Sequence, residues 1–301
     1  MAAGLIDAYA SKPHYLHHIQ QIWTSVPAEH RGSLLTAPTP GGQLTLVASY
    51  ADLKAVRKVG RPTILAEHGT GQSYLGTTNG SYIGAPDRAG VAAVLVPGAS
   101  QAARHLAAHP TIPAYVTGVR PAARPGPGDG TVAISFHWDC QIVPETRSAL
   151  RWYRPALARL AAAVPLIGHA HPRHMGQVAR LYDRLGIEPV ASFDEVCERA
   201  DVYAVDNSST LYEFAALDRP VVVLNAPWYR RDVHHGMRFW EHADMGVQVD
   251  DPRDLVDGVT SSYADPCAAR RSAVIDEVFT PGEIPWPDLI GEVRCSIPSR
   301  S

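Results

Sequence analysis

One short polar segment has the residue types needed to hold an anion. Asp206-Asn207-Ser208-Ser209-Thr210 follows an apolar run and precedes a helix-like stretch. Backbone N–H groups at the start of a helix lack hydrogen-bond partners and lie at the positive end of the helix dipole. We therefore expect Ser208, Ser209 and Thr210 to hold a pyrophosphate, with their hydroxyls as further donors. The competing interpretation is that Asp206 or Ser208 only caps the helix, which is a common role of both residue types.

Charged side chains elsewhere in the second half could complete a nucleotide site. Glu213 lies on the same expected helix, where its carboxylate could accept hydrogen bonds from the hydroxyls of a ribose; a solvated helix glutamate is the alternative. In the segment 168–174, Arg173 and either His169 or His171 could neutralise a diphosphate. A metal site is the rival interpretation, but His-x-His-x-x-His without an obvious carboxylate partner is only a weak zinc signature, so we expect anion binding and no metal.

A histidine in the first half of the chain could act as a general base. His68 follows an apolar run and begins the segment His68-Gly69-Thr70-Gly71. Its ordinary pKa of about 6.5 suits removal of a proton from an acceptor hydroxyl. Gly69 and Gly71 would let a ligand approach the backbone closely, and we expect them, with Thr70, on the acceptor side of the site. The segment lacks the lysine that a phosphate-binding P-loop requires.

The elements that would position these residues alternate between short apolar strands and helices. This alternation is typical of βαβ units and of parallel sheets that helices cover on both faces. The candidate residues would then follow the carboxyl ends of strands, where open parallel sheets bind ligands. Strands are predicted at residues 44–49, 62–67, 91–96, 131–136, 165–168, 202–205, 220–224 and 246–249, and helices at 14–26, 50–59, 100–108, 145–163, 173–185, 210–217 and 252–259.

A Pro/Gly-rich stretch, residues 119–130, interrupts the alternation. Such a composition favours a linker between domains. We therefore predict an N-terminal, acceptor-side α/β domain at residues 1–120 and a C-terminal, donor-binding α/β domain at residues 131–265. The tail, residues 266–301, starts like a helix and then contains prolines, which cannot lie inside one continuous helix. One placement for this tail is back against the N-terminal domain.

Composition narrows the class of protein. With 301 residues, of which 46% are hydrophobic and 19% charged, the chain suits two ordinary globular domains. A formal net charge of -3 gives no global attraction to nucleic acid. The sequence has neither an apolar run of about 18 residues nor a signal-peptide pattern, so we expect a cytoplasmic protein without membrane insertion. Its four cysteines are far apart, which argues against disulfides and a thiolate zinc site.

Taken in order, these motifs resemble those of a known family. His-Gly-Thr at 68–70, a Pro/Gly-rich linker, a strand ending in His-Ala-His-Pro, and Asp-x-Ser-Ser before Phe-Ala-x-Leu-Asp-x-Pro are similar to motifs of the CDP-glycerol glycerophosphotransferases. These are teichoic-acid polymerase-like members of the GT-B superfamily. The resemblance, over roughly residues 44–257, implies two Rossmann-like α/β domains facing across a cleft. It also implies that His68 is the base and that His171 and residues 206–209 contact the donor's phosphates.

The resulting prediction is a transferase that needs neither metal nor cofactor. It takes a nucleotide-activated donor and passes a glycosyl or glycerol-phosphoryl group to an acceptor hydroxyl on a polymer, a small molecule or a hydroxylated nucleic-acid base. Asn207 and Gly71 stand where the family usually has Tyr and Pro. The resemblance therefore supports a GT-B transferase more firmly than it supports glycerol phosphate as the transferred group. Two alternatives stay open: a sugar-nucleotide epimerase, which isomerises its donor without an acceptor, and a non-catalytic nucleotide-binding module.

Overall fold

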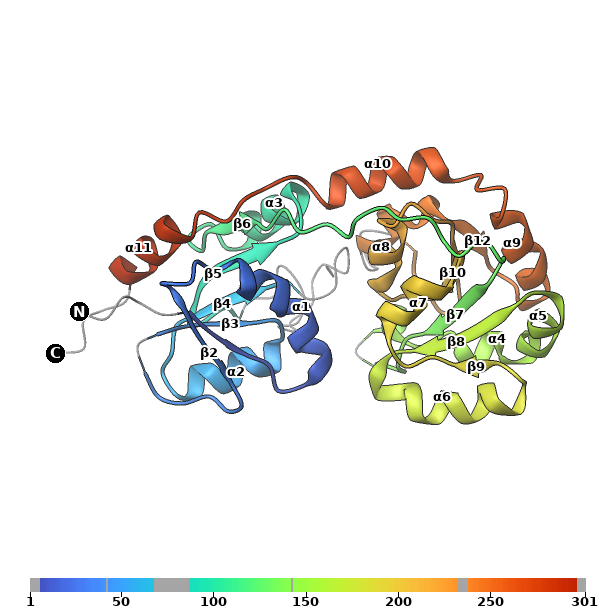
Figure 1. Ribbon diagram of the computed structural model, residues 1–301, viewed down its shortest axis with the longest axis horizontal. Coiled ribbons are helices and arrows are strands. Elements are labelled where there is room, and N and C mark those ends of the chain that lie inside the picture. Colours follow the sequence, from blue (N-terminus) through green and yellow to red (C-terminus); the bar gives the residue numbers. More distant parts are fainter. Residues whose placement is uncertain (1–5, 42, 68–86, 142, 232–237, 297–301) are drawn as a thin grey trace. The chain divides into compact units, whose positions relative to one another are not determined.

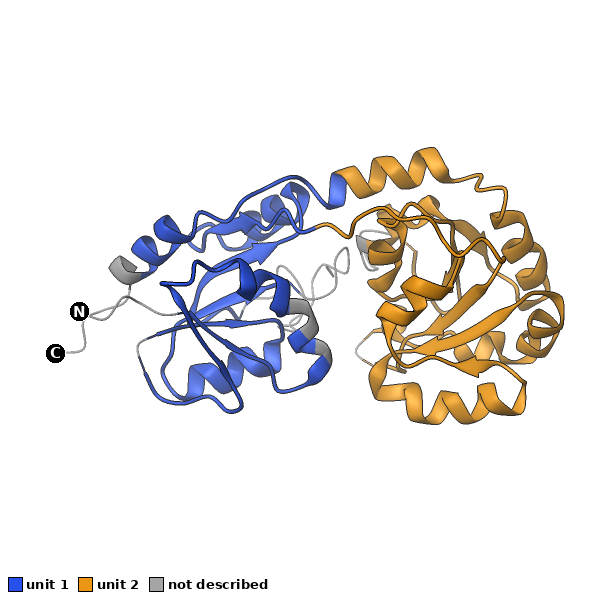
Figure 2. Ribbon diagram, viewed as in Figure 1, with its two compact units in different colours: residues 1–119, 277–301 blue, residues 120–276 orange. Residues whose placement is uncertain are grey.

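The computed structural model describes residues 6–41, 43–67, 87–141, 143–231 and 238–296 (Figure 1). The chain divides into two compact units, an N-terminal unit of residues 1–119 and 277–301 and a C-terminal unit of residues 120–276 (Figure 2). Each unit has one six-stranded sheet in which every pairing is parallel. The prediction of two Rossmann-like α/β domains is therefore confirmed.

The N-terminal unit has the strand order β2-β1-β3-β4-β5-β6. Side chains that alternate along its strands form two buried clusters, one packed with α1 and α11 and the other with α2 and α3. Helices thus cover both faces of the sheet, which explains why its strands are almost continuously apolar. The strands are β1 (Ile6–Tyr9), β2 (Arg31–Leu35), β3 (Leu44–Val47), β4 (Thr63–Ala66), β5 (Val91–Val96) and β6 (Ala114–Val116), and the helices are α1 (Pro13–Ser25), α2 (Tyr50–Lys58), α3 (Ala99–Ala108) and α11 (Trp286–Ser296).

The last helix of the chain belongs to the N-terminal unit. In α11, Trp286, Leu289, Ile290 and Val293 follow helical spacing and are buried in the cluster that includes α1. The chain therefore completes the N-terminal core only after it has passed through the whole C-terminal unit.

The C-terminal unit has the strand order β12-β11-β10-β7-β8-β9. Its strands are β7 (Val132–Phe136), β8 (Leu166–Ala170), β9 (Glu188–Pro189), β10 (Val202–Val205), β11 (Val221–Leu224) and β12 (Val247–Val249). Its helices are α4 (Leu150–Tyr153), α5 (Leu157–Ala163), α6 (Pro172–Arg184), α7 (Phe193–Arg199), α8 (Thr210–Ala215), α9 (Leu255–Ser262) and α10 (Ala268–Val278), with 3-10 turns η1 (Pro144–Thr146), η2 (Arg154–Ala156), η3 (Arg238–Glu241), η4 (Ala243–Met245) and η5 (Pro252–Asp254). No helix within the described ranges is long and apolar enough to cross a membrane.

One predicted helix is wrong. Residues 145–163 form η1, α4, η2 and α5 in succession instead of one helix. Pro155 lies in η2, and proline has no backbone N–H to donate while its ring clashes with the preceding helical turn. Pro155 thus accounts for the turn between α4 and α5, while the break between η1 and α4 lies at Arg147, whose backbone is extended.

The order in which the chain adds strands to the C-terminal sheet reverses between β7 and β10, although all strands stay parallel. From β7 the chain adds β8 and β9 on one side, and then returns to add β10, β11 and β12 on the other. Parallel crossovers are almost always right-handed, so α4, α5 and α6 cover one face of the sheet while α7 and α8 cover the opposite face. In open sheets of this kind, ligands bind beyond the carboxyl ends of the strands at the point of reversal.

Candidate functional site

Asp206 occupies the point of reversal, directly after β10. It is fully buried, and its Oδ1 accepts a hydrogen bond of 2.8 Å from the backbone N–H of His137. Its Oδ2 accepts one of 3.0 Å from the N–H of Ala149. Burial raises the pKa of this carboxyl to about 7, against the lowering effect of those backbone donors. Asp206 thus ties the segments that follow β7 and precede α4 to the end of β10, and it organises the site from inside.

Asn207 is also part of the internal scaffold. Its side chain is buried, and its Nδ2 donates to the carbonyl of Arg147 at 2.9 Å and to the hydroxyl of Tyr229 at 3.0 Å. The hydroxyl of Tyr229 in turn donates to the same carbonyl at 2.7 Å. Asn207 therefore links the segment after β7 to the segment after β11, which holds the polar turn in place.

Ser208 and Thr210 begin a row of hydroxyl groups that runs into the sheet. The Thr210 hydroxyl donates to Ser208 Oγ at 2.8 Å, and the Thr210 backbone N–H reaches the same oxygen at 3.4 Å. The hydroxyl of Tyr203, from β10, lies 2.9 Å from Thr210 Oγ1. Ser208 Oγ thus accepts a hydrogen bond from the Thr210 hydroxyl, whereas its capping bond from the Thr210 backbone N–H is long. Ser209, the residue before α8, makes no side-chain capping bond.

The row continues to a buried histidine on β8. Ser135 lowers the pKa of the Tyr203 hydroxyl, against the raising effect of burial, and its Oγ lies 2.8 Å from Nδ1 of His169. Burial lowers the pKa of His169 to about 4, so its ring is neutral at pH 7. Because Thr210 donates to Ser208, Tyr203 is the donor to Thr210. Ser135 lowers the pKa of Tyr203, as a donor to its oxygen does, so we assign Ser135 as donor to Tyr203 and His169 Nδ1–H as donor to Ser135.

In this assignment, every group in the row donates its hydrogen bond to the next group toward the surface. The last oxygen is Ser208 Oγ, which is half-buried and accepts two hydrogen bonds. Its own proton is used by no group that the structure describes. Aligned donors polarise one another, so a row of this kind makes the final hydroxyl a better donor to an anion than an isolated serine. We call Ser208, Thr210, Tyr203, Ser135 and His169 the donor row.

Of the two histidines that sequence reasoning left open, His169 is the internal one. Its side chain is buried and its ring lies 5.9 Å from that of Phe193 in α7, measured between centroids. His171 instead precedes α6, where its Nδ1 accepts from the N–H of Arg173 at 3.1 Å. That bond places the proton of a neutral His171 ring on Nε2.

His171 and Arg173 belong to an aromatic cluster at the ends of β7 and β8. The centroid of the His171 ring lies 5.0 Å from that of His137 and 6.2 Å from that of Trp138. The Arg173 guanidinium lies over the Trp138 ring, 5.1 Å from its centroid. Burial lowers the pKa of His137 to about 4. Because His137 also donates its backbone N–H to Asp206, this cluster and the polar turn are joined at the point of reversal.

Glu213 lies one turn after Thr210 on α8. Its pKa is raised to about 7, first by burial and then by the nearby carboxylate of Asp194 in α7. Residues three apart on a helix share a face, so Glu213 and Thr210 lie on the same side of α8. A carboxyl in this state can donate or accept, and two hydroxyls of a sugar would relieve the cost of its burial.

The predicted acceptor-side residues His68, Gly69, Thr70 and Gly71 lie outside the described residues. The residue before them, Glu67, follows the carboxyl end of β4 in the N-terminal sheet. Burial raises the pKa of Glu67 to about 8, while Arg104 acts in the opposite direction. Sequence reasoning missed this carboxyl, although its position next to His68 at a strand end is the signal that could have found it.

The structure thus brings together most of the donor-side residues predicted from sequence, within the C-terminal unit. Sequence reasoning missed the members that link them. In the described ranges, no three His, Cys, Asp or Glu side chains gather in a way that could hold a metal ion. The missed residues are Ser135 and Tyr203 of the donor row and His137 and Trp138 of the aromatic cluster.

The sequence matches no protein-family model and no curated protein. The fold, in contrast, matches solved structures along nearly their whole length. Anabaena HepE in complex with UDP-glucose is 13% identical, with a TM-score of 0.53 over 97% of this chain and 99% of that chain. A putative UDP-N-acetylglucosamine 2-epimerase from Listeria monocytogenes is 11% identical, with a TM-score of 0.58 over 98% and 96%. The wall teichoic acid polymerase TagF is 11% identical, with a TM-score of 0.60 over 97% and 88%. These likenesses, together with the two parallel six-stranded units, identify the chain as a protein with the GT-B fold.

Proposed function

We propose that the chain is a GT-B-type transferase whose C-terminal unit binds a donor activated by a nucleoside diphosphate. The observation that carries this proposal is the donor row, which ends in the Ser208 hydroxyl beyond the carboxyl ends of β7 and β10. A series of neutral, aligned donors suits a phosphate oxygen, because it supplies hydrogen bonds without a buried charge. HepE, which has a similar fold, has been solved with UDP-glucose and with UDP.

The remaining donor-side residues have separate roles in this proposal. His171 donates from Nε2 and Arg173 supplies a positive charge, so that the two stabilise the negative charge that grows on the departing nucleotide. Glu213 receives the ribose hydroxyls on the same face of α8 as Thr210. The proposed reaction needs no metal and no cofactor, because hydrogen bonds and a guanidinium take over charge stabilisation.

The acceptor reacts at its hydroxyl oxygen. His68, which lies outside the described residues, is the proposed base: it takes the hydroxyl proton as the oxygen attacks. Attack on the anomeric carbon of a nucleotide sugar breaks the carbon–oxygen bond and releases a nucleoside diphosphate. Attack on the phosphorus of a CDP-glycerol-like donor breaks the pyrophosphate bond and releases a nucleoside monophosphate. The acceptor is a polymer, a small molecule or a hydroxylated nucleic-acid base.

A sugar-nucleotide epimerase is the second candidate. The Listeria putative UDP-N-acetylglucosamine 2-epimerase has a similar fold, and Glu67 with its raised pKa is a carboxyl able to exchange protons near pH 8. An epimerase would return an isomer of its donor when no acceptor is present. Mass and stereochemistry of the product therefore separate the two activities.

Thermal-shift measurements with nucleoside diphosphates and their sugar and glycerol conjugates test the proposal first. A ligand that binds only the folded protein raises its melting temperature, and we expect at least one nucleoside diphosphate to do so. The bound donor is then incubated with candidate acceptors, and products are identified by mass. His68→Ala should abolish turnover but preserve the thermal shift; unchanged turnover in that variant contradicts the assignment of the base.

A further inference from the structure

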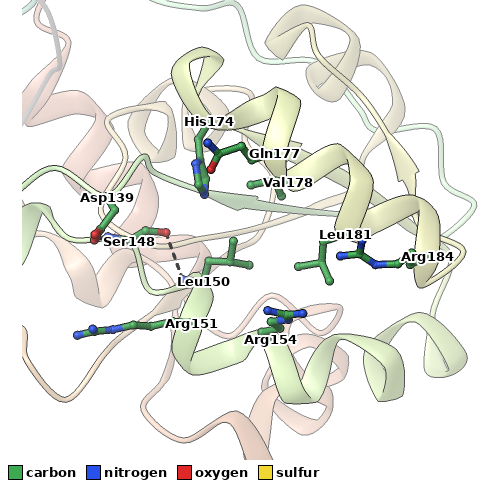
Figure 3. A pocket seen from close by; sticks show the side chains of 10 residues that line it. All are labelled: Asp139, Ser148, Leu150, Arg151, Arg154, His174, Gln177, Val178, Leu181 and Arg184. Carbon is green, nitrogen blue, oxygen red and sulfur yellow. Dashed lines mark hydrogen bonds between the residues drawn. The ribbon is translucent and has the colours of Figure 1, made fainter.

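A groove on the face of the C-terminal sheet opposite to α8 is lined by residues that suit a second anion site. Its walls are α4 with η2 on one side and α6 on the other (Figure 3), and its volume is about 330 Å³. Because α8 covers the other face of the sheet, this groove is separate from Ser208 and Glu213.

Arginines from both walls line the groove. Arg151 of α4 and Arg154 of η2 stand on one wall, and Arg184 stands at the end of α6 on the other. No carboxylate forms an ion pair at contact distance with any of the three within the part of the chain that the structure describes, although Arg151 helps to lower the pKa of Asp139. Arg151 is held by the ring of Trp228, with its guanidinium carbon 4.0 Å from the ring centroid. Asp139, the carboxylate among the lining residues, is already bound by both arms of Arg147 at 2.7 and 2.8 Å.

The charge of this region does not follow the charge of the whole chain. From Thr146 to Tyr182 the sequence contains six arginines and no aspartate, glutamate or lysine, in a chain with a formal net charge of -3. Three arginines share the groove with one carboxylate, Asp139, that Arg147 already neutralises, so they repel one another and an anion in the groove would reduce that repulsion. Arginine also offers paired donors that match two oxygens of a phosphate group, which a lysine does not.

The shape of the groove indicates the size and kind of ligand. One stripe of α6 lines it, at the spacing of successive helical turns, and Val178 and Leu181 of that stripe form an apolar floor with Leu150 of α4. His174 and Gln177 of the same stripe add polar groups at one end. A recess of about 330 Å³ with an apolar floor is in the range of small-molecule pockets. A membrane surface would instead require a flat basic face with exposed apolar residues.

We infer that this groove binds a phosphate ester of a small organic molecule, such as a phosphorylated sugar or polyol. The phosphate lies between the guanidinium groups of Arg154 and Arg184, and the organic part rests on Leu150, Val178 and Leu181. This site goes beyond the proposed donor site and does not depend on it, because it uses different residues on the other face of the sheet.

Calorimetric titration of the full chain with glucose 1-phosphate and with inorganic pyrophosphate tests the inference. Arg154→Gln and Arg184→Gln, both at exposed positions, should each weaken phosphate-ester binding about tenfold, because each removes one charge-assisted contact. Arg180→Gln is the matched control, since it removes the same charge from α6 outside the groove and should leave binding unchanged.

Binding measurements on the Ser208→Ala variant distinguish this site from the proposed donor site. Phosphate-ester binding that survives Ser208→Ala but is lost in the Arg154→Gln, Arg184→Gln double variant supports the inference, whether or not nucleotides bind. Binding that is lost in Ser208→Ala and kept in the double variant overturns it. Binding to phosphatidylglycerol vesicles without binding of glucose 1-phosphate overturns it as well, because the groove would then serve a membrane surface.

Discussion

Among single residues, two members of the donor row are hydroxyl groups whose role cannot be recognised from the sequence. Tyr203 and Ser135 lie inside the apolar runs that form β10 and β7, where they look like ordinary core residues. The polar turn 206–210 was recognisable because its residue types cap helices and bind anions. The choice between His169 and His171 was not recognisable, because it depends on where β8 ends: the strand ends at Ala170, so His169 lies inside it while His171 precedes α6.

Tyr203→Phe should weaken binding of a nucleoside diphosphate by about fivefold, because it breaks the donor row at a single net hydrogen bond and leaves the ring in place. Calorimetric titration measures the change. Tyr153→Phe is the matched control: it also removes a buried hydroxyl, one that donates to the carbonyls of Asn225 and Val249, but it lies outside the donor row. Equal loss of affinity in both variants would show that the row has no special role.

Glu213→Gln should change the pH dependence of stability. The carboxyl has an ordinary pKa of 4.5 and a folded pKa of about 7, so the folded state binds more protons than the unfolded state between those values. Glu213 therefore contributes stability that is lost as pH rises through this window, up to about 3 kcal/mol, and the glutamine variant lacks this one contribution. Urea denaturation of both proteins at pH 4.5 and pH 8 measures it. A stability difference that is the same at both values contradicts the assigned environment of Glu213.

At the scale of elements, the alternation of strands and helices predicted the core of both sheets but missed their margins. β1 contains Asp7, a charged residue that a strand pattern does not lead one to expect in a buried position. The structure explains it: Asp7 is bound by the buried guanidinium of Arg61, and its Oδ1 accepts from the N–H of Ser33 at 2.7 Å. These partners lie 54 and 26 residues away, so local sequence patterns could not reveal them.

Arg61→Met should lower the free energy of unfolding by about 3–5 kcal/mol, because it leaves the Asp7 carboxylate buried without its counter-charge. Arg57→Met provides the comparison, since the side chains of Arg57 and Asp87 are 33% and 36% exposed and such pairs contribute about 1 kcal/mol or less. Urea denaturation gives both values. Similar losses in the two variants would mean that the Asp7–Arg61 pair does not hold β1 in the sheet.

In the whole molecule, the chain leaves the N-terminal unit once, returns to it at Glu277 near the end of α10, and completes its core with α11. The prolines of the tail indicated that one helix could not continue, but they did not indicate where the last helix packs. That placement depends on an apolar face of the N-terminal sheet that residues near the start of the chain leave uncovered. Each unit has its own sheet. The residues that stabilise the N-terminal unit are therefore different from those that we propose to bind a nucleotide in the C-terminal unit.

Leu289→Ala should destabilise the N-terminal unit by about 2–5 kcal/mol, because this side chain is fully buried in the core and its removal leaves a cavity. Nucleotide affinity should not change at temperatures where the protein is folded. Amide hydrogen exchange locates the loss of protection, which we expect in β1, β3 and α1 and not in β7 or β10. Loss of protection concentrated in the C-terminal sheet would contradict the assignment of α11 to the N-terminal core.

We propose above that the C-terminal unit binds a nucleoside diphosphate through the donor row. Calorimetric titration of UDP and CDP into the wild type, Ser208→Ala and Ser261→Ala tests it most directly. Ser261 is an exposed serine on α9 whose hydroxyl donates to the carbonyl of Gly258 at 2.9 Å, so its variant controls for loss of a hydroxyl. We predict binding of at least one nucleotide to the wild type and to Ser261→Ala, and binding about tenfold weaker to Ser208→Ala. Failure of both nucleotides to bind the wild type, or equal affinity in all three proteins, would contradict the claim.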